Sequence, residues 1–280
     1  MNLKYDSYSV RTIWLSLLLS AVVAGCGDLF GGHGGDGSNW SSGKAGAGTG
    51  VGGAGRGPAP VDLLSISTNN FVVLSQAGIT NTGSHSTAIT GNIAASPITA
   101  AAMDNVFCTE ITGFIFGVDL AYTGSSDVSC FDSNPPTTAN TAVADMGTAY
   151  ADATGRPADF TELGAGIIGG LNLGPATYKW TTAIQIPSTL TLTGGANDVW
   201  IFQGTGTLSI SSGVQITLAG GALPQNIYWV VSSAADLATT SNFKGTILSG
   251  TGIDMKTGAT INGRLLAKTA VTLDHNTIGP

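Results

Sequence analysis

Residues 186–278 repeat one short pattern, in which a central apolar residue is flanked by Thr, Ser, Ala or Gly. The copies read Ser188-Thr189-Leu190-Thr191-Leu192, Gly206-Thr207-Leu208-Ser209-Ile210, Ala235-Asp236-Leu237-Ala238-Thr239, Thr251-Gly252-Ile253-Asp254-Met255 and Thr269-Ala270-Val271-Thr272-Leu273, with an earlier relative at Ala77-Gly78-Ile79-Thr80-Asn81. Their centres lie 18, 29, 16 and 18 residues apart, which is close to the length of one solenoid coil except for one longer coil. The spacing predicts a β-helix.

A second set of short strands is apolar at nearly every position. It comprises Val199-Trp200-Ile201-Phe202, Ile227-Tyr228-Trp229-Val230-Val231, Gly245-Thr246-Ile247-Leu248 and Arg264-Leu265-Leu266-Ala267. Strands without alternation are buried on both sides, so another element should pack over this set. Corners between strands are expected where Gly or Asn makes positive φ accessible. They are Gly194-Gly195, Ser212-Gly213, Gly220-Gly221, Thr257-Gly258 and His275-Asn276.

One amphipathic helix is predicted over residues 141–154. Its apolar residues recur every three or four positions, at Ala142, Val143, Met146, Ala149, Tyr150 and Ala153. Gly155 and Pro157 follow, where a C-terminal glycine and a helix-breaking proline would end it. The apolar stripe must be buried, and the doubly apolar strands are its natural partner. We therefore expect the helix to lie along the side of the solenoid.

The composition limits the classes of function. The 280 residues carry a net charge of −7, only 10% of them are charged, and 41 are Gly. This surface lacks the basic patch that nucleic-acid binding requires, so we expect no nucleic-acid partner. A chain of this length can form one sizeable domain with appendages.

The N-terminal segment resembles an export signal. Residues 1–25 contain Lys4, Arg11 and then a short apolar run, and the stretch Val23-Ala24-Gly25-Cys26 is similar to a bacterial lipobox. Cys26 would then be lipidated; the alternative is an ordinary signal peptide followed by an accidental Cys. A Gly-rich flexible linker is expected over residues 26–60 and the folded domain over 61–280. We expect an exported protein, at the outer membrane or cell surface if lipidated and otherwise secreted, whose only membrane contact is the lipid anchor.

Residues 101–136 interrupt the predicted strands and hold the two remaining cysteines, Cys108 and Cys130. In an exported protein such a pair is expected to form a disulfide. The three histidines have no metal-ligand spacing, so we expect neither a metal site nor a cofactor.

Many stretches of residues 61–279 closely resemble, in the same order, the microbial ice-binding proteins of the DUF3494 type. Those stretches include Asn70-Phe71-Val72-Val73-Leu74, Ile89-Thr90-Gly91-Asn92-Ile93, Ala153-Thr154-Gly155-Arg156-Pro157, Gly174-Pro175-Ala176-Thr177-Tyr178-Lys179-Trp180, Asp198-Val199-Trp200-Ile201-Phe202-Gln203, Asn226-Ile227-Tyr228-Trp229-Val230-Val231, Phe243-Lys244-Gly245-Thr246-Ile247-Leu248 and Ile261-Asn262-Gly263-Arg264-Leu265-Leu266-Ala267. The resemblance implies a discontinuous right-handed parallel β-helix of triangular section, with a long α-helix alongside and a capping insertion at one end.

The resemblance also implies that a flat face of the β-helix binds ice. We expect the protein to act as a monomer. By position, the outward residues would be Ala77, Thr80, Thr189, Thr191, Thr207, Ser209, Ala235, Ala238, Thr251, Thr269 and Thr272. The array departs from a pure threonine ladder, because Asp236, Asp254 and Lys268 lie in it or beside it. An outward register shifted by one residue in some coils would account for this.

Two other classes of function fit a β-helix. One is a cell-surface adhesin or carbohydrate-binding protein, although few exposed aromatic residues are expected here. The other is a polysaccharide-cleaving enzyme, which needs clustered carboxylates. Here Asp198, Asp236, Asp254 and Asp274 fall mostly near corners of different coils. We therefore do not expect an enzyme.

Overall fold

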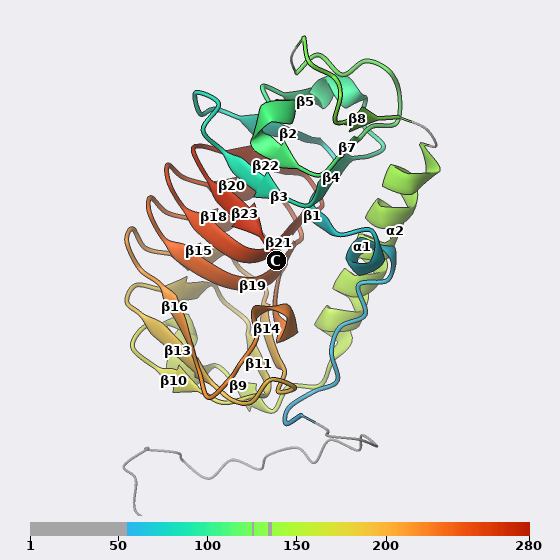
Figure 1. The fold of residues 1–280 in the computed structure, drawn as a ribbon. Coiled ribbons are helices and arrows are strands. Elements are labelled where there is room, and N and C mark those ends of the chain that lie inside the picture. Colours follow the sequence, from blue (N-terminus) through green and yellow to red (C-terminus); the bar gives the residue numbers. More distant parts are fainter. Residues whose placement is uncertain (1–54, 125, 134–135) are drawn as a thin grey trace, which may run out of the picture. The chain divides into compact units, whose positions relative to one another are not determined.

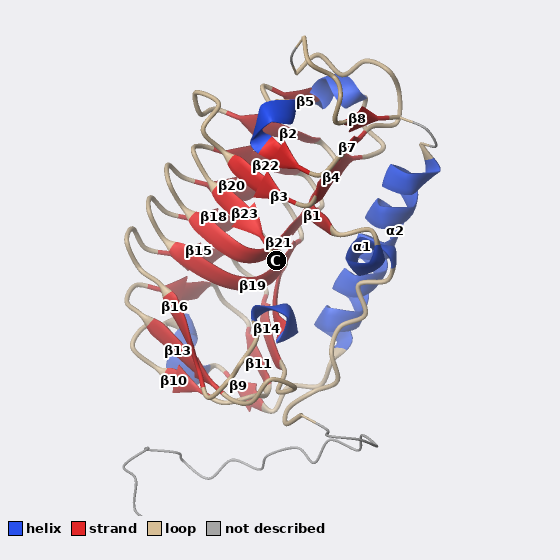
Figure 2. Cartoon of the chain, in the orientation of Figure 1, coloured by secondary structure: helices blue, strands red, loops and turns tan. Residues whose placement is uncertain are grey.

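The chain folds into stacked coils whose strands form three faces, in a computed structural model that describes residues 55–124, 126–133 and 136–280 (Figure 1). Every strand pairing recorded among these residues is parallel. Apolar side chains at alternate positions turn into the solenoid, and the intervening side chains turn outward. The predicted β-helix is confirmed, and Figure 2 shows its strands stacked beside one long helix.

The first face, here called the helix-covered face, continues through ten strands in the order β8-β7-β4-β1-β21-β19-β17-β14-β11-β9. Their bounds are β8 Phe131–Asp132, β7 Ile115–Phe116, β4 Asn92–Ala95, β1 Phe71–Ser75, β21 Thr260–Ala267, β19 Asn242–Ser249, β17 Ile227–Val231, β14 Trp200–Gly204, β11 Thr177–Trp180 and β9 Phe160–Thr161.

The second face, here called the seven-stranded face, has the order β12-β15-β18-β20-β22-β2-β5. The strands are β12 Ile184–Ile186, β15 Leu208–Ile210, β18 Ala235–Leu237, β20 Ile253–Met255, β22 Ala270–Leu273, β2 Gly78–Asn81 and β5 Met103–Asp104.

The third face begins with β10 Asn172–Leu173, β13 Leu190–Thr193 and β16 Ile216–Ala219. It continues through the first residues of β19 and β21 to β23 Thr277–Gly279, β3 Ala88–Thr90 and β6 Ile111–Thr112. The long strands β19 and β21 bend between faces at Gly245 and Gly263, where φ is +106° and +150°. A Cβ on Gly263 would lie 2.0 Å from the Gly245 carbonyl oxygen, so only glycine allows this close stacking.

The stacking order differs from the chain order, as the resemblance implied. Strand β1 pairs with β21, so the N-terminal coils are placed on the C-terminal coil. In Figure 1 the teal strands β1 to β4 accordingly lie next to the red strands β21 to β23. Helix α2, Thr137–Gly155, lies along the stack and leads the chain from the N-terminal coils to the coil that contains β9.

Helix α2 begins four residues earlier than predicted. Pro136 is its N-cap, and Thr137 to Asn140 extend it without adding to the apolar stripe except at the buried Ala139. Its apolar residues pack on the helix-covered face beside Phe71, Leu74, Ile201, Tyr228, Val230, Leu248 and Leu266. The C-terminal end is fixed by Gln203, whose side-chain amide donates to the carbonyls of Ala153 and Arg156, at 2.8 Å each. The predicted packing of the helix on doubly apolar strands is confirmed.

A second apolar cluster fills the inside of the solenoid. It includes an aromatic row across four successive coils, formed by Tyr178, Phe202, Trp229 and Phe243. The ring centroids of consecutive members lie 5.3, 4.0 and 5.2 Å apart. Because adjacent coils are one strand spacing apart, the paired rings of Tyr178, Phe202 and Trp229 stack directly. Phe243 is not at the equivalent position, and its ring packs against Trp229 at an angle of 57°.

The corners between the seven-stranded face and the third face use left-handed residues at three of the predicted sites, with His275 rather than Asn276 taking the positive φ at the last of them. The predicted site Gly220-Gly221, elsewhere in the long coil, also has positive φ, of +73° and +98°. Gly213, Gly258 and His275 have φ of +70°, +69° and +54°. In the long coil the corresponding residue is Thr240, with φ of +57°. The N–H groups of Gly213, Thr240 and Gly258 donate to carbonyls of the next coil. At the predicted corner Gly194-Gly195, the structure records no positive φ.

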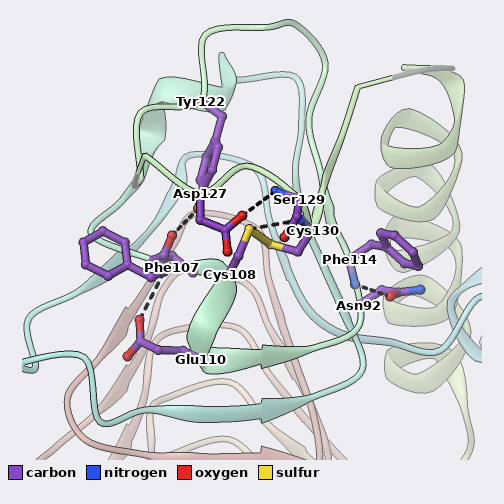
Figure 3. Close-up of a disulfide and its surroundings, with 10 residues drawn as sticks. Asn92, Phe107, Cys108, Glu110, Phe114, Tyr122, Asp127, Ser129 and Cys130 are labelled. Atoms are coloured by element: carbon purple, nitrogen blue, oxygen red, sulfur yellow. Dashed lines mark hydrogen bonds between the residues drawn. A yellow bond between two sulfur atoms is a disulfide. The ribbon is translucent and has the colours of Figure 1, made fainter.

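The segment expected as an interruption, residues 101–136, also extends the stack. Strands β5, β6 and β7 add a strand to each of the three faces. The expected disulfide is present between Cys108 and Cys130, with an S–S distance of 2.06 Å (Figure 3). It joins the loop after β5 to the residue before β8. Closing a loop with a sequence separation of 22 stabilises the fold by about 3 kcal/mol in the chain-entropy view.

Arg56 fastens the start of the described chain to the solenoid. Its guanidinium Nε and Nη2 donate to Asp198 Oδ2 at 3.1 and 2.9 Å, and its backbone N–H donates to Oδ1 at 2.5 Å. Although burial opposes ionisation, the backbone N–H groups of Arg56 and Gly195 and the Arg56 cation together lower the pKa of Asp198. The expected linker therefore ends several residues before residue 60.

The expected signal peptide, Cys26 and most of the linker lie outside the described residues. Among the residues that are described, no helix is long and apolar enough to cross a membrane.

Asp198→Asn should destabilise the fold at about pH 7 by roughly 1–3 kcal/mol, because the Arg56 cation would lose its buried carboxylate partner. A carboxyl group whose pKa is lowered by folding contributes stability above its unfolded pKa of about 3.9, and this contribution is lost as the pH falls through the folded pKa. The difference between wild type and variant, measured by urea unfolding, should therefore shrink below about pH 4. The exposed Asp236→Asn is the control and should change stability by at most about 0.5 kcal/mol. A wild-type advantage that is the same at about pH 7 and pH 2.5 would contradict this account of Asp198.

Candidate functional site

The seven-stranded face is the most regular exposed surface of the described chain. Its pairings are in continuous register, so one outward residue of each strand falls in a straight column. In order along the face, the column is Gln185, Ser209, Asp236, Asp254, Thr272, Thr80 and Asp104. The residues on either side of this column, such as Ile253 and Met255, are buried in the solenoid.

A second column lies two positions earlier in each coil and consists of small residues. It is formed by Ala183, Thr207, Ala234, Gly252, Ala270, Gly78 and Ala102. The residues just before these form the edge of the face, and they are Thr182, Gly206, Ser233, Thr251, Thr269, Ala77 and Ala101. No lysine, arginine or aromatic residue occurs in these three columns of the described chain. The result is a surface of short side chains repeated about every 4.8 Å across the strands.

Two lysines lie close to the three columns of this face. Lys256 forms an ion pair with Asp254. Lys268 turns to the other side of its corner, where its Nζ lies 3.5 Å from the centre of the Tyr150 ring. Lys256 is therefore held by a carboxylate of the central column, and Lys268 is held away from the face by Tyr150.

Most of the predicted outward residues lie on this face. Thr207, Ser209, Thr272 and Thr80 belong to the two strand columns, and Ala77, Thr251 and Thr269 form part of the edge. Ala238 follows β18 and is half-buried.

The prediction is wrong for Ala235, which is 0% exposed and points into the core. Ala235 pairs with Leu208 and Ile253, so Ala235 rather than Leu237 is the central residue of its coil. The long coil before β18 hid this shift of two residues. Thr189 and Thr191 also lie outside the array. Thr189 immediately precedes β13 and Thr191 lies within it, on the third face.

A four-residue pattern would have found the correct register. Aligned on the paired residues, the coils read Ser233-Ala234-Ala235-Asp236, Thr251-Gly252-Ile253-Asp254, Thr269-Ala270-Val271-Thr272 and Ala77-Gly78-Ile79-Thr80. Two small residues precede one inward residue and one outward polar residue. In this register the central column includes Asp236, Asp254 and Asp104. Asp236 and Asp254 are thus regular members of the array and not departures from it.

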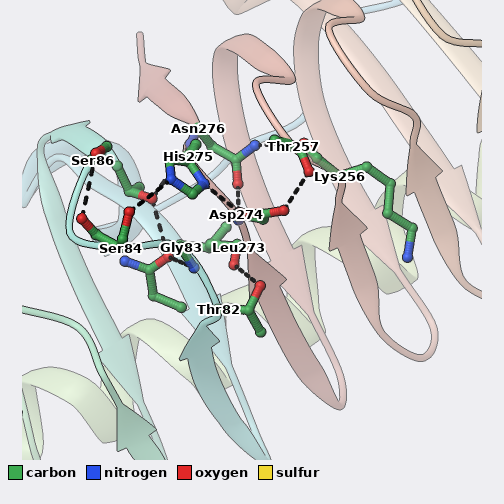
Figure 4. A network of polar contacts seen from close by, with 12 residues as sticks. Thr82, Gly83, Ser84, Ser86, Lys256, Thr257, Leu273, Asp274, His275 and Asn276 are labelled. Carbon is green, nitrogen blue, oxygen red and sulfur yellow. Dashed lines mark hydrogen bonds and ion pairs between the residues drawn. The ribbon is translucent and has the colours of Figure 1, made fainter.

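A polar network braces the corner where the C-terminal coil meets the N-terminal one (Figure 4). Thr257 donates to Asp274, His275 Nδ1 lies 2.5 Å from the other Asp274 oxygen, and His275 Nε2 lies 3.1 Å from Ser84 Oγ. The Thr257 hydroxyl and then His275 lower the pKa of Asp274. Because the network links residues from three coils, it holds the adjacent seven-stranded face in register across the discontinuity.

The other two faces do not offer a comparable surface. Helix α2 covers the first face. On the third face, η4, Pro224–Asn226, contacts β19 and β21 and interrupts the surface of the strands there. Among the described residues, no three His, Cys, Asp or Glu side chains cluster to hold a metal ion.

Comparison with known proteins agrees with this geometry. The sequence model of the ice-binding-like family matches residues 73–279. An ice-binding protein of Flavobacterium frigoris (strain PS1) is 50% identical over 220 residues, covering 78% of this chain and 76% of the relative. An ice-binding protein of a Colwellia species is 47% identical over 209 residues, covering 74% of this chain and 79% of the relative.

A solved structure shows the same fold. It is that of an ice-binding protein with antifreeze activity from an Arctic yeast, with a TM-score of 0.70 and 33% sequence identity. The match covers 79% of this chain and 94% of the yeast protein. With the family match extending over most of the sequence and the fold shared, this chain belongs to the ice-binding-like family.

Proposed function

We propose that this protein binds ice through its seven-stranded face, as a single chain, and thereby inhibits ice growth and recrystallisation. The observation that carries the proposal is the straight register of its outward columns, which places short side chains at a constant repeat across seven strands. Family membership supports it, because relatives at up to 50% identity are ice-binding proteins.

The chemistry of the face suits a crystalline partner. Ice offers no pocket-sized group to enclose, so recognition must come from many weak contacts at a fixed repeat. A threonine or serine side chain can hydrogen-bond one water molecule, and its neighbouring methyl groups, with those of Ala, leave little room for water in other arrangements. Ordered water over such an array can continue into the ice lattice.

The carboxylates of the central column change how this surface orders water. Asp236 is exposed, whereas Asp254 is partly neutralised by Lys256. A charged oxygen binds water more strongly than a hydroxyl does and in its own geometry. The region from Ala270 and Thr272 to Gly78 and Thr80 is therefore expected to be the most effective part of the face.

A bulky side chain on this face should do disproportionate harm to ice binding. Thr207→Tyr places a ring in the column of small residues, which would hold the neighbouring coils away from the crystal as well. We expect most of the recrystallisation inhibition to be lost at equal protein concentration. The melting temperature should hardly change, since exposed substitutions alter stability by at most about 0.5 kcal/mol.

Thr90→Tyr is the matched control. Thr90 is also an exposed threonine of a solenoid strand, but it lies in β3 on the third face. This variant should keep full activity. Equal activity of both variants would mean that the seven-stranded face is not the ice-binding surface, and loss in both would point to a nonspecific effect.

No observation favours the adhesin or carbohydrate-binding alternative over ice binding. The relatives reported above are named as ice-binding proteins, and none is described as an enzyme.

We also propose that Cys26 anchors the exported protein to a membrane through a lipid. The support is the sequence Val23-Ala24-Gly25-Cys26 after an apolar run, followed by a Gly-rich stretch. In a Gram-negative host, the wild-type protein should partition into the detergent phase, and Cys26→Ala should move it to the aqueous phase. Mass analysis should give a mature chain that begins with an acylated Cys26; a mature chain that begins elsewhere would refute the anchor.

A further inference from the structure

Two buried serines lie at the corner between the helix-covered face and the seven-stranded face. Ser75 is the last residue of β1 and Ser249 the last of β19, and both are fully buried. The strand register places them in one column, with Ala267 of β21 between them. Two residues after each serine comes a member of the edge of the seven-stranded face, Ala77 or Thr251. The serine column therefore lies directly behind that edge.

The Ser75 hydroxyl holds the start of β2 from the inside. Its oxygen accepts the N–H groups of Ala77 and Gly78 at 3.2 and 2.8 Å. Its single proton is within reach of two carbonyl oxygens, that of Gly78 at 2.7 Å and that of Thr269 at 2.6 Å. Ala77 and Gly78 belong to the same coil as Ser75, whereas Thr269 is the edge residue of the neighbouring coil. One hydroxyl thus joins the edges of the two coils that meet at the discontinuity.

Ser249 repeats this arrangement two coils away. Its hydroxyl oxygen accepts the Thr251 N–H at 3.3 Å. Its proton is within reach of the carbonyl oxygens of Gly252 at 3.0 Å and Ser233 at 2.8 Å. Ser233 is the edge residue of the neighbouring coil, so this hydroxyl also joins two edges.

A backbone hydrogen bond connects the two serine sites. The Thr269 N–H donates to the Thr251 carbonyl at 3.1 Å. A line of hydrogen bonds consequently runs behind the edge from Ser233 through Thr251 and Thr269 to Ala77. At a corner the chain leaves the regular strand ladder, and its backbone groups need other partners. The two serine hydroxyls supply them.

We propose that Ser75 and Ser249 are positioning residues of the ice-binding face, an inference that rests on the proposed function. Neither hydroxyl can touch ice, because both are fully buried. Each acts through the edge residues, since the backbone of the corner decides whether their side chains lie level with the column of small residues. Without the hydroxyl, N–H and C=O groups of the corner lose a partner, and the corner backbone must shift to reach water. A shifted edge breaks the flat array while the remaining coils keep the fold.

Ser75→Ala and Ser249→Ala test the inference on the full chain, because alanine removes only the hydroxyl. Each variant should need several-fold more protein than the wild type for the same recrystallisation inhibition, and the double variant should need more still. Circular dichroism should show all three variants folded at the temperature of the ice assay. The melting temperature should fall by only about 2–4 °C for each hydroxyl removed.

Tyr178→Phe is the matched control for a loss of stability. Tyr178 is buried on β11, away from the seven-stranded face, and its hydroxyl donates to the Gly174 carbonyl at 2.9 Å. This variant should lower the melting temperature by a similar amount and leave inhibition unchanged. Ser241→Ala is the control for removing a buried serine hydroxyl as such. The Ser241 hydroxyl is buried without a hydrogen-bond partner among the described residues, so this variant should change neither quantity.

The two serine sites are tested separately, so that misfolding of one variant leaves the other to decide. The inference is overturned if the serine variants inhibit recrystallisation as well as Tyr178→Phe does at an equal fall in melting temperature. Unfolding of both serine variants at the assay temperature would also overturn it, because the hydroxyls would then support the whole fold and not the edge. An inactive wild type would refute ice binding itself, whereas an active wild type beside equally active serine variants would refute only the role of the serines.

Discussion

The parallel register between successive coils is the constraint on which the rest of this molecule depends. Backbone hydrogen bonds hold equivalent residues of neighbouring coils one strand spacing apart, so each position of the repeat becomes a column. Inside the solenoid, columns become stacked apolar rows such as Phe202 on Trp229, with ring centroids 4.0 Å apart. Outside it, the same register turns an imperfect internal repeat of Thr, Ala, Gly and Asp into a periodic surface. The core and the proposed ice-binding face are therefore two consequences of one spacing.

Because the order of the coils is discontinuous, the same register must also hold between strands that are far apart in sequence. Strands β1, β2 and β3 must join the C-terminal coil at the same spacing as the other strands do, although almost two hundred residues separate Ser75 from Ala267 in sequence. The Asp274, His275 and Ser84 contacts span this junction at one corner, and helix α2 spans it along the helix-covered face. Ala270 and Thr272 on one side and Gly78 and Thr80 on the other consequently form one uninterrupted surface.

Much of the fold could be predicted from the sequence because each element has its own local signal. The doubly apolar strands need an apolar cover, and the amphipathic stripe of Ala142, Met146 and Ala149 needs an apolar surface to pack against. The two pack together as predicted. The register of the outward residues had no such signal in the coil before β18. There, the loop with Gly220, Gly221 and η4 lengthens the coil, and alignment on Leu237 rather than Ala235 looks equally good until strand pairing is known. For the same reason Thr191 could not be separated from the array, since alternation reveals which residues point outward but not to which of three faces they belong.

A protein with this register should bind ice itself. The most direct measurement is the partition of the full chain between slowly growing ice and the remaining liquid, beside a soluble protein of equal size and net charge. The account predicts that this chain is enriched in the ice fraction while the control is excluded from it. Exclusion of both proteins to the same extent would contradict the account.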